Sequence, residues 1–391
     1  MSAAGLPLHR DKIMLVGLDG IPLSEPKTGV GHYTIELARA LAHCSPSDEF
    51  EIVSPRPFLP TAGAEAMLPA NLRLRQAEVN AFTRHWWTIG LPRYIKKRAF
   101  TIFHGTNYEV PLRKRCPAVL TIHDLSLQLY PETHERRRVS RARRRLPLMV
   151  RCAELIITPT ESVREEVCEH LRVSPERVFV VPEAPREIFR PMSLAETEEA
   201  RRRLGTEDDF LLFVGTIEPR KNLRLLLRAF AEILSSTPFR PQLVIAGQRG
   251  WLSDQLFRDL TEYAIADRVL FTGYLSDEDL CALYSSCRAF VYPSLYEGFG
   301  LPPLEAMKCG APVVASRVRS ISEVTGGAAL LFTSENLDEL VQHLIRLLTD
   351  DAQRASLSSS GLARAAQFSW ERTARLTLEV YGKALAGWRQ K

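Results

Sequence analysis

Paired cysteines and long apolar segments are both missing from this chain of 391 residues. Its seven cysteines are odd in number, scattered and never spaced as C-x-x-C, which predicts reduced thiols and argues against a disulfide framework or a zinc site. The longest apolar runs have the length of single strands and are too short to cross a bilayer. No cleavable apolar segment precedes the first expected strand, so we expect a cytoplasmic protein without a secretory signal.

Acidic residues are absent from one strongly basic stretch. Between Arg136 and Arg151 there are eight arginines and no carboxylate, whereas the whole chain has a net charge of only +5. The rest of the chain is therefore net negative, and no stacking aromatics are interleaved with the arginines, so we expect no nucleic-acid partner. Apolar residues recur three and four apart here, which predicts an amphipathic helix that kinks or restarts at Pro147. Such a helix either rests on the anionic inner face of the plasma membrane or forms a solvated arginine face.

Short apolar segments alternate with helical patterns along the whole chain. Continuous apolar strands separated by helices predict parallel sheets with both faces covered. Two such series, in a chain too long for one hydrophobic core, predict an α/β fold with two doubly wound, Rossmann-like domains. The expected strands are 13–18, 51–53, 101–104, 119–123, 155–158 and 178–181, then 210–214, 243–246, 269–272, 289–292, 313–315 and 329–332.

Prolines between residues 182 and 191 interrupt both periodicities and mark the expected domain boundary. We therefore expect an N-terminal domain over 1–190 and a C-terminal domain over 191–370. A final helix over 371–391 carries an apolar stripe that suits packing on either domain.

One cationic segment follows the strand expected at 210–214. Gly215 and Thr216 begin it, and Gly215 allows a tight turn at the carboxyl end of the strand, where open α/β sheets bind ligands. Arg220 and Lys221 lie just before the next helix and suit phosphate as a bidentate fork and a compact charge. Positive charge at a helix N-terminus is unfavourable by about 0.3–1 kcal/mol per residue. A bound anion would remove that penalty, so we favour a phosphate site over a solvated pair.

A glycine-rich segment follows the strand expected at 289–292. Glycines permit close backbone approach here, and Pro302 or Pro303 can begin the next helix. The backbone N–H groups at this helix start can face an oxyanion. They belong to Gly298, Phe299, Gly300 and Leu301. Glu297, in the loop, is free to reach sugar hydroxyls, whereas Glu305, one turn into the helix, either binds a ribose diol or compensates the helix dipole.

These segments together resemble a known enzyme family. Glu297 and Glu305 are separated by seven residues, and the run 293–310 resembles the signature of glycosyltransferase family four, which has the GT-B fold of two Rossmann-like domains. The segments 217–222 and 271–275 resemble two other motifs of that family's donor-binding domain. The resemblance implies a retaining hexosyltransferase that uses a nucleotide sugar and needs neither a cofactor nor a metal. The absence of a D-x-D triad at a strand end agrees with that expectation.

The resemblance also implies roles for individual residues. Arg220 and Lys221 would hold the donor diphosphate. Glu297 would contact the transferred sugar near its reacting face, and Glu305 the ribose. The backbone around Tyr274 and Leu275 would border the base.

Two features of the first half complete the expected site. Gly29 and Gly31, in the run from Thr28 to Tyr33, follow the first strand but lack the third glycine of a dinucleotide fingerprint. They resemble the family's glycine loop, which faces the donor phosphate, and the alternative is a plain strand–helix turn. His123 ends the strand expected at 119–123 and resembles the family's active-site histidine, the alternative being a histidine that only satisfies its loop.

The resemblance to bacterial mannosyltransferases of surface polysaccharides favours GDP-mannose as donor and a lipid-linked or oligosaccharide acceptor. UDP-linked hexoses remain alternative donors. A sugar-nucleotide 2-epimerase on the same scaffold is a rival enzyme class, which would need a paired acid and base. A nucleotide-sensing or lipid-docking protein is the rival without catalysis.

Overall fold

The computed structural model describes residues 13–25, 29–59, 68–251 and 254–390. The described part excludes residues 1–12, for which we expect no secretory signal. It also excludes Thr28 of the expected glycine loop. The chain divides into two compact units. The first holds the described residues of Met1–Ile122, Leu146–Ile157 and Glu371–Lys391, and the second holds those of His123–Arg145 and Thr158–Trp370.

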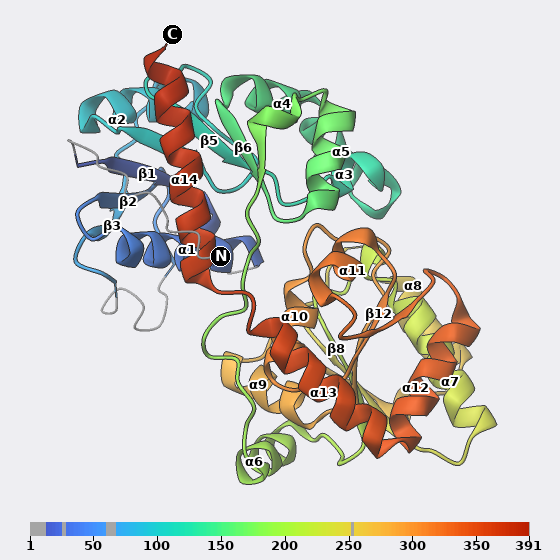
Figure 1. Ribbon diagram of the computed structural model, residues 1–391. Coiled ribbons are helices and arrows are strands. Elements are labelled where there is room, and N and C mark those ends of the chain that lie inside the picture. The colour runs from blue at the N-terminus through green and yellow to red at the C-terminus, as the bar shows by residue number, and fades with distance from the viewer. Residues whose placement is uncertain (1–12, 26–28, 60–67, 252–253, 391) are drawn as a thin grey trace. The chain divides into compact units, whose positions relative to one another are not determined.

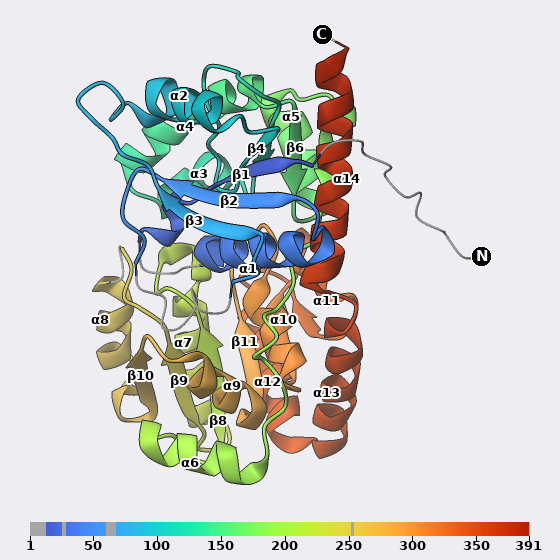
Figure 2. The same ribbon diagram turned by 90° about the vertical axis from the view of Figure 1, so that its left-hand side faces the viewer.

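Two largely parallel sheets organise the chain (Figures 1 and 2) and confirm the predicted α/β fold of two Rossmann-like layers. The first has seven strands in the order β3-β2-β1-β4-β5-β6-β7, and the second has six in the order β10-β9-β8-β11-β12-β13. The strands of the first sheet are β1 Leu15–Asp19, β2 Glu49–Ser54, β3 Leu72–Gln76, β4 Ile102–Gly105, β5 Ala118–Thr121, β6 Leu155–Thr158 and β7 Val178–Val180. Those of the second are β8 Phe210–Val214, β9 Gln242–Ala246, β10 Val269–Gly273, β11 Ala289–Tyr292, β12 Val313–Ser316 and β13 Leu330–Phe332.

All twelve expected strands are present, with ends that differ by no more than two residues. One boundary affects the site, because β5 ends at Thr121 and His123 lies beyond it instead of within it. The strand β3 was not expected. Its sequence, LRLRQ, alternates apolar and polar residues at the edge of the sheet, and only Leu72 is buried.

Helices α1 Gly29–Cys44, α2 Leu91–Arg98 and α14 Trp370–Arg389 accompany the first sheet, and α3 Ser126–Leu129, α4 Arg136–Cys152 and α5 Glu161–Leu171 follow it. The helices of the second sheet are α6 Leu194–Leu204, α7 Leu223–Ser236, α8 Asp254–Glu262, α9 Asp277–Ser286, α10 Leu301–Lys308, α11 Arg319–Thr325, α12 Leu337–Thr349 and α13 Asp351–Ala365. The helix α4 is continuous through Pro147, so the expected restart at this residue is wrong. In Figure 2, α14 runs alongside the first unit, where Tyr381 bonds His104 of β4 (OH to Nδ1, 2.8 Å).

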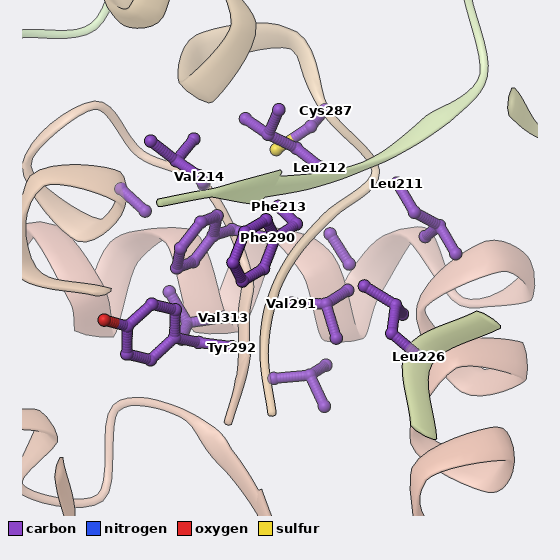
Figure 3. Packing of buried hydrophobic residues seen from close by; sticks show 14 of the residues in the cluster. Leu211, Leu212, Phe213, Val214, Leu226, Cys287, Phe290, Val291, Tyr292 and Val313 are labelled. Carbon is purple, nitrogen blue, oxygen red and sulfur yellow. The ribbon is translucent and has the colours of Figure 1, made fainter. Parts of the chain in front are cut away.

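Apolar stripes fix how the second sheet is covered. The buried face of α7 includes Leu223, Leu226 and Phe230, and this helix packs beside α12 (Figure 1). On β8 and β11, Phe213, Phe290 and Tyr292 form a stacked aromatic cluster (Figure 3), with Tyr292 5.8 Å from Phe290 and 6.2 Å from Phe213 between ring centroids. Burying each such side chain stabilises the fold by about 1.5–3 kcal/mol. This packing holds together β8 and β11, the two strands that precede the loops of the candidate site.

Candidate functional site

The candidate site lies where the strand order of the second sheet reverses. In the order given above, the chain runs outward from β8 through β9 to β10 and then returns to β11 on the other side of β8. Loops at the carboxyl ends of two such strands diverge and leave room for a ligand. The two motifs expected to bind phosphate are the loops that follow β8 and β11. The fold therefore brings them to one place.

Direct contacts join the two loops. Lys221 Nζ lies 2.6 Å from Glu297 Oε1, and Arg220 Nη1 lies 2.9 Å from Glu297 Oε2. Arg220 also donates to the carbonyl of Tyr296 (2.7 Å), and its own carbonyl accepts from Leu295 N (2.9 Å). Arg220, Lys221 and the start of the glycine-rich segment thus form one cluster.

Two further side chains complete the cluster. Lys221 Nζ donates to the hydroxyl of Tyr292 at 2.6 Å, and Figure 3 shows that this hydroxyl points away from the rings of Phe213 and Phe290. Glu218 Oε1 lies 2.8 Å from Arg220 Nη2. The result is a buried group of two cations and two carboxylates.

Backbone conformation sets up both loops. Gly215 has φ 152°, a left-handed value that L side chains rarely adopt, and the chain then makes a short 3₁₀ turn over Pro219–Lys221. Gly300, with φ 100°, is the N-cap of α10, whose first turn contains Pro302 and Pro303 as expected. Gly298 packs against the carbonyl of His123, where an added Cβ would lie 1.8 Å from the oxygen.

Burial and charge act in opposite directions on Glu297. Burial alone would raise the pKa of this carboxyl, but Arg220 and Lys221 outweigh it and lower the pKa to about 2. Burial lowers the pKa of Lys221, and Glu297 opposes that change. Glu297 is therefore a carboxylate at neutral pH, able to accept hydrogen bonds and to stabilise positive charge but not to donate a proton.

Glu305 has a different environment. It lies one turn into α10, where burial raises its pKa to about 7, against the opposing effects of Arg186 and Tyr284 nearby. Asp277 of α9 also raises it. The two carboxyl groups of the signature therefore differ in charge near neutral pH.

The segment after β5 reaches the same loops within the second unit. His123 Nδ1 lies 2.9 Å from Glu183 Oε1, and its carbonyl contacts Gly298. The hydroxyl of Tyr296 accepts from Leu125 N (2.9 Å) and donates to Glu166 (2.5 Å). Tyr296 thus connects the segment that carries His123 to the loop that carries Glu297.

Comparison with known proteins gives the family. The chain matches Glycosyl transferases group 1 over residues 195–364 and Glycosyltransferase Family 4 over residues 27–184. It is 33% identical to the O-antigen chain mannosyltransferase B of Escherichia coli over 377 residues, which cover 92% of this chain and 97% of that protein. The chain belongs to glycosyltransferase family four.

Other relatives of this glycosyltransferase are similar over a part of their length. It is 34% identical to the serotype-specific mannosyltransferase WbdA of Escherichia coli over 60% of its own chain and 29% of WbdA. It is 33% identical to the MMP alpha-(1->4)-mannosyltransferase of Mycolicibacterium hassiacum over 59% of its own chain and 54% of that enzyme. The chain therefore spans nearly all of the first relative and less than a third of WbdA.

Solved structures share the GT-B fold of the glycosyltransferase. HepE of Anabaena, in complex with UDP and glucose, has a TM-score of 0.73 at 20% identity, covering 94% of this chain and 99% of HepE. WaaG, a glycosyltransferase of lipopolysaccharide biosynthesis, has a TM-score of 0.70 at 16% identity, covering 93% and 98%. No helix in the described residues of the glycosyltransferase is both long and apolar enough to span a bilayer.

The remaining expected residues of the glycosyltransferase lie outside the ion cluster. Gly29 and Gly31 are in the first turn of α1 in the first unit, so they are helical and not part of a loop ahead of the helix. Tyr274 and Leu275 follow β10, with the Tyr274 side chain 61% exposed and Leu275 buried. Thr216 is in the turn after β8, and Phe299 and Leu301 flank the N-cap Gly300. The ring of Phe299 packs in the core against Phe368, so only its backbone faces the site expected here.

Sequence reasoning missed Glu218, Tyr292 and Tyr296 of the glycosyltransferase. Tyr292 and Tyr296 look like core and loop residues in the sequence, and only their hydroxyl contacts reveal a polar role. Asp19, in the first unit, is a further buried carboxyl group that the sequence analysis did not single out. It ends β1 at the reversal point of the first sheet, is 2% exposed, and burial raises its pKa to about 7. The available sequence signal was an acidic residue at the end of the first strand, ahead of the first long helix.

Proposed function

We propose that this glycosyltransferase transfers mannose from GDP-mannose, with retention of configuration and without a metal, to a hydroxyl of a lipid-linked or oligosaccharide acceptor. The reaction belongs to the synthesis of a bacterial surface polysaccharide. Three relatives named as mannosyltransferases support the transferred sugar, and one of them is aligned over almost its whole length.

The buried cluster of Arg220, Lys221 and Glu297 is the observation that carries the proposal. Sugar transfer requires charge stabilisation of a departing nucleoside diphosphate. Arg220 supplies a fork that suits two phosphate oxygens, and Lys221 supplies a compact charge beside it. The N–H groups from Gly298 to Leu301, at the start of α10, add the positive end of a helix dipole.

Glu297 stays ionised, and we assign its carboxylate to the transferred sugar. Its carboxylate would accept hydrogen bonds from sugar hydroxyls and stabilise the positive charge that develops at the anomeric carbon as the bond to phosphate breaks. The acceptor oxygen then forms the new bond from the same face. Its proton moves to the departing phosphate oxygen, so no covalent nucleophile on the protein is needed. Glu305, further along α10, would bind the ribose diol.

Donor identity is tested by ligand-induced stabilisation. Thermal unfolding would be followed with GDP, UDP, ADP and their hexose conjugates, each with and without EDTA. A ligand at 100 times its dissociation constant stabilises the protein by about 2.7 kcal/mol. We expect the largest shift with GDP and GDP-mannose, unchanged by EDTA, and an α-linked product by NMR from the α-linked donor. No shift with any nucleotide would overturn the proposal.

UDP-glucose is the second candidate donor, because HepE, which shares the fold, is solved with UDP and glucose. The same screen separates the two donors. A shift with UDP and UDP-glucose but not with GDP would select the second.

We also propose that α4 contacts an anionic membrane surface. Seven of its eight arginines are exposed, and it has no acidic residue in its first turn. Positive charge at a helix N-terminus is unfavourable, and each arginine near an anionic surface instead gains about 1 kcal/mol. Flotation with vesicles containing anionic lipid should recover the protein at low salt, and the triple variant of Arg136, Arg137 and Arg141 to glutamine should float less. Absence of wild-type flotation even at low salt would remove this proposal.

A further inference from the structure

A buried histidine near the ion cluster has no hydrogen-bond partner among the described residues. His134 follows the short turn η4 Pro131–Thr133 in the second unit, and its side chain is 9% exposed. Both ring nitrogens, Nδ1 and Nε2, are buried and unpaired. Buried polar atoms without partners are rare and costly in folded proteins. An unpaired imidazole here therefore calls for a ligand that pairs it.

The loop after β9 holds this histidine beside the site. Ile217 N donates to the carbonyl of Gln248 (2.9 Å), and Gly250 N donates to the carbonyl of Ile217 (3.0 Å), so residues 248–251 run along the loop after β8. Trp251 Nε1 then donates to the carbonyl of Thr133 at 2.7 Å. These bonds tie the residue preceding His134 to the loop that carries Arg220.

Ring contacts fix the orientation of His134. Its ring lies 5.8 Å from that of Trp251, at 30° between planes, and Arg138 covers Trp251 at 5.2 Å. Burial and the nearby charge of Arg220 lower the pKa of His134, although Glu218 and Asp124 oppose this change. The ring is therefore neutral at pH 7, and its pKa responds to Arg220 and Glu218 of the ion cluster.

We propose that His134 is a specificity-determining residue that hydrogen-bonds a hydroxyl group of a sugar substrate. A neutral imidazole has one donor and one acceptor that point in different directions, and neighbouring hydroxyl groups of a sugar can pair both, because a hydroxyl donates as well as accepts. A phosphate only accepts and would leave one nitrogen unpaired. The inference rests on the proposed glycosyl transfer. Because both nitrogens lie below the surface, sugar binding requires the imidazole to turn or the residues that cover it to move. Trp251, beside the ring, would report that movement.

The test uses His134→Phe, His134→Gln and the matched control His343→Phe. His343, on α12, also has a buried ring nitrogen without a partner among the described residues, but it lies outside the site loops. Each phenylalanine variant removes at least one buried ring nitrogen that has no partner among the described residues. Each should therefore raise the unfolding midpoint by about 2 °C. Only His134→Phe should weaken sugar recognition, by about tenfold, which corresponds to one lost hydrogen bond. Glutamine, with a donor and an acceptor, should restore part of that loss.

Calorimetry and kinetics identify which sugar is bound. The ligands are GDP, GDP-mannose, UDP, UDP-glucose and an oligomannose acceptor. If His134→Phe has a higher Kd for the nucleotide sugar but an unchanged Kd for the free nucleotide, His134 contacts the donor hexose. An unchanged donor Kd with a raised acceptor KM assigns it to the acceptor. A change in Trp251 fluorescence on adding the sugar, lost in His134→Phe, should accompany either result.

If His134→Phe has the same Kd and KM as an active wild-type enzyme for every sugar, this inference is overturned. An inactive wild-type enzyme that binds no nucleotide would instead overturn the proposed function. The two failures are therefore distinguishable.

Discussion

Replacing Glu297 by glutamine removes one charge from a buried group that holds two cations. The carboxylate of Glu297 lies 2.6 Å from Lys221 and 2.9 Å from Arg220, and all three side chains are at most 12% exposed. Glutamine has nearly the same shape but no charge. The substitution therefore leaves both cations with a weaker partner in a place that water hardly reaches.

The size of the effect follows from the pKa of Glu297. The interactions of the folded state lower it from 4.5 to about 2. At about 1.4 kcal/mol per unit, this shift corresponds to roughly 3 kcal/mol of stabilisation by the ionised form. The value agrees with the roughly 3–5 kcal/mol lost when one partner of a buried ion pair is removed.

The same pKa shift fixes the direction in which the free energy of unfolding changes with pH. Because the pKa is lower in the folded state, the stabilisation is fully present above about pH 4.5 and is lost as the pH falls from there towards 2. Wild type and Glu297→Gln should thus differ by roughly 3 kcal/mol in free energy of unfolding at pH 7, and by progressively less below pH 4.5.

Thermal and denaturant unfolding at pH 7, 5, 4 and 3.5 would measure this difference. Glu218→Gln is the matched control, since it takes a carboxylate only from Arg220 and should destabilise less. Glu297→Gln should still bind GDP at least as tightly, because a competitor for the two cations is gone, while turnover falls by orders of magnitude. Equal stability of the variant and the wild type at pH 7, or a gap that persists undiminished at pH 3.5, would refute the reasoning.

Three further predictions concern single contacts. Gly298→Ala should lower turnover more than a hundredfold, because its Cβ would lie 1.8 Å from the carbonyl oxygen of His123, whereas Gly387→Ala, with no atom within 4 Å, should leave steady-state kinetics unchanged. Glu305→Gln should be more stable than wild type at pH 8 but not at pH 4.5. The folded-state pKa of Glu305 is raised to about 7, so the wild type loses stability as the pH rises from 4.5 to 7. Unfolding midpoints of both proteins at pH 4.5 and pH 8 would check this. Tyr381→Phe should cost about 1 kcal/mol, measured by denaturant unfolding, because its hydroxyl bonds His104 in the core of the first unit; an unchanged midpoint would count against that contact.

That the loops after β8 and β11 lie close together was predictable, because it follows from the topology of the sheet. Segments after β8 and β11 meet once the chain is recognised as doubly wound, since the reversal of strand order places these two strands side by side. The residue types in both loops then suggest the chemistry proposed for the site. No knowledge of side-chain orientation was needed to bring Arg220 and Lys221 close to Glu297.

Other features depend on tertiary contacts that leave no local pattern. The bonds from Tyr296 to Leu125 and from Trp251 to Thr133 hold residues 123–145 to the second unit, although this segment follows a strand of the first sheet. The edge strand β3 was missed because its alternating arginines are typical of a solvated segment. The helix α4 passes through Pro147, although proline lacks a backbone donor and usually kinks or ends a helix.

The balance of charge in the ion cluster indicates how the site would change on binding a donor. Arg220 and Lys221 are paired with Glu218 and Glu297, so side chains alone offer an incoming diphosphate little net positive charge. The N–H groups at the start of α10 would then supply much of the initial attraction. As the diphosphate takes over the two cations, Glu297 would be released towards the sugar. Under the proposed function, Glu297 would thus hold both cations in position until the phosphate binds, which would explain why a carboxylate assigned to the sugar is buried against the cations assigned to the leaving group.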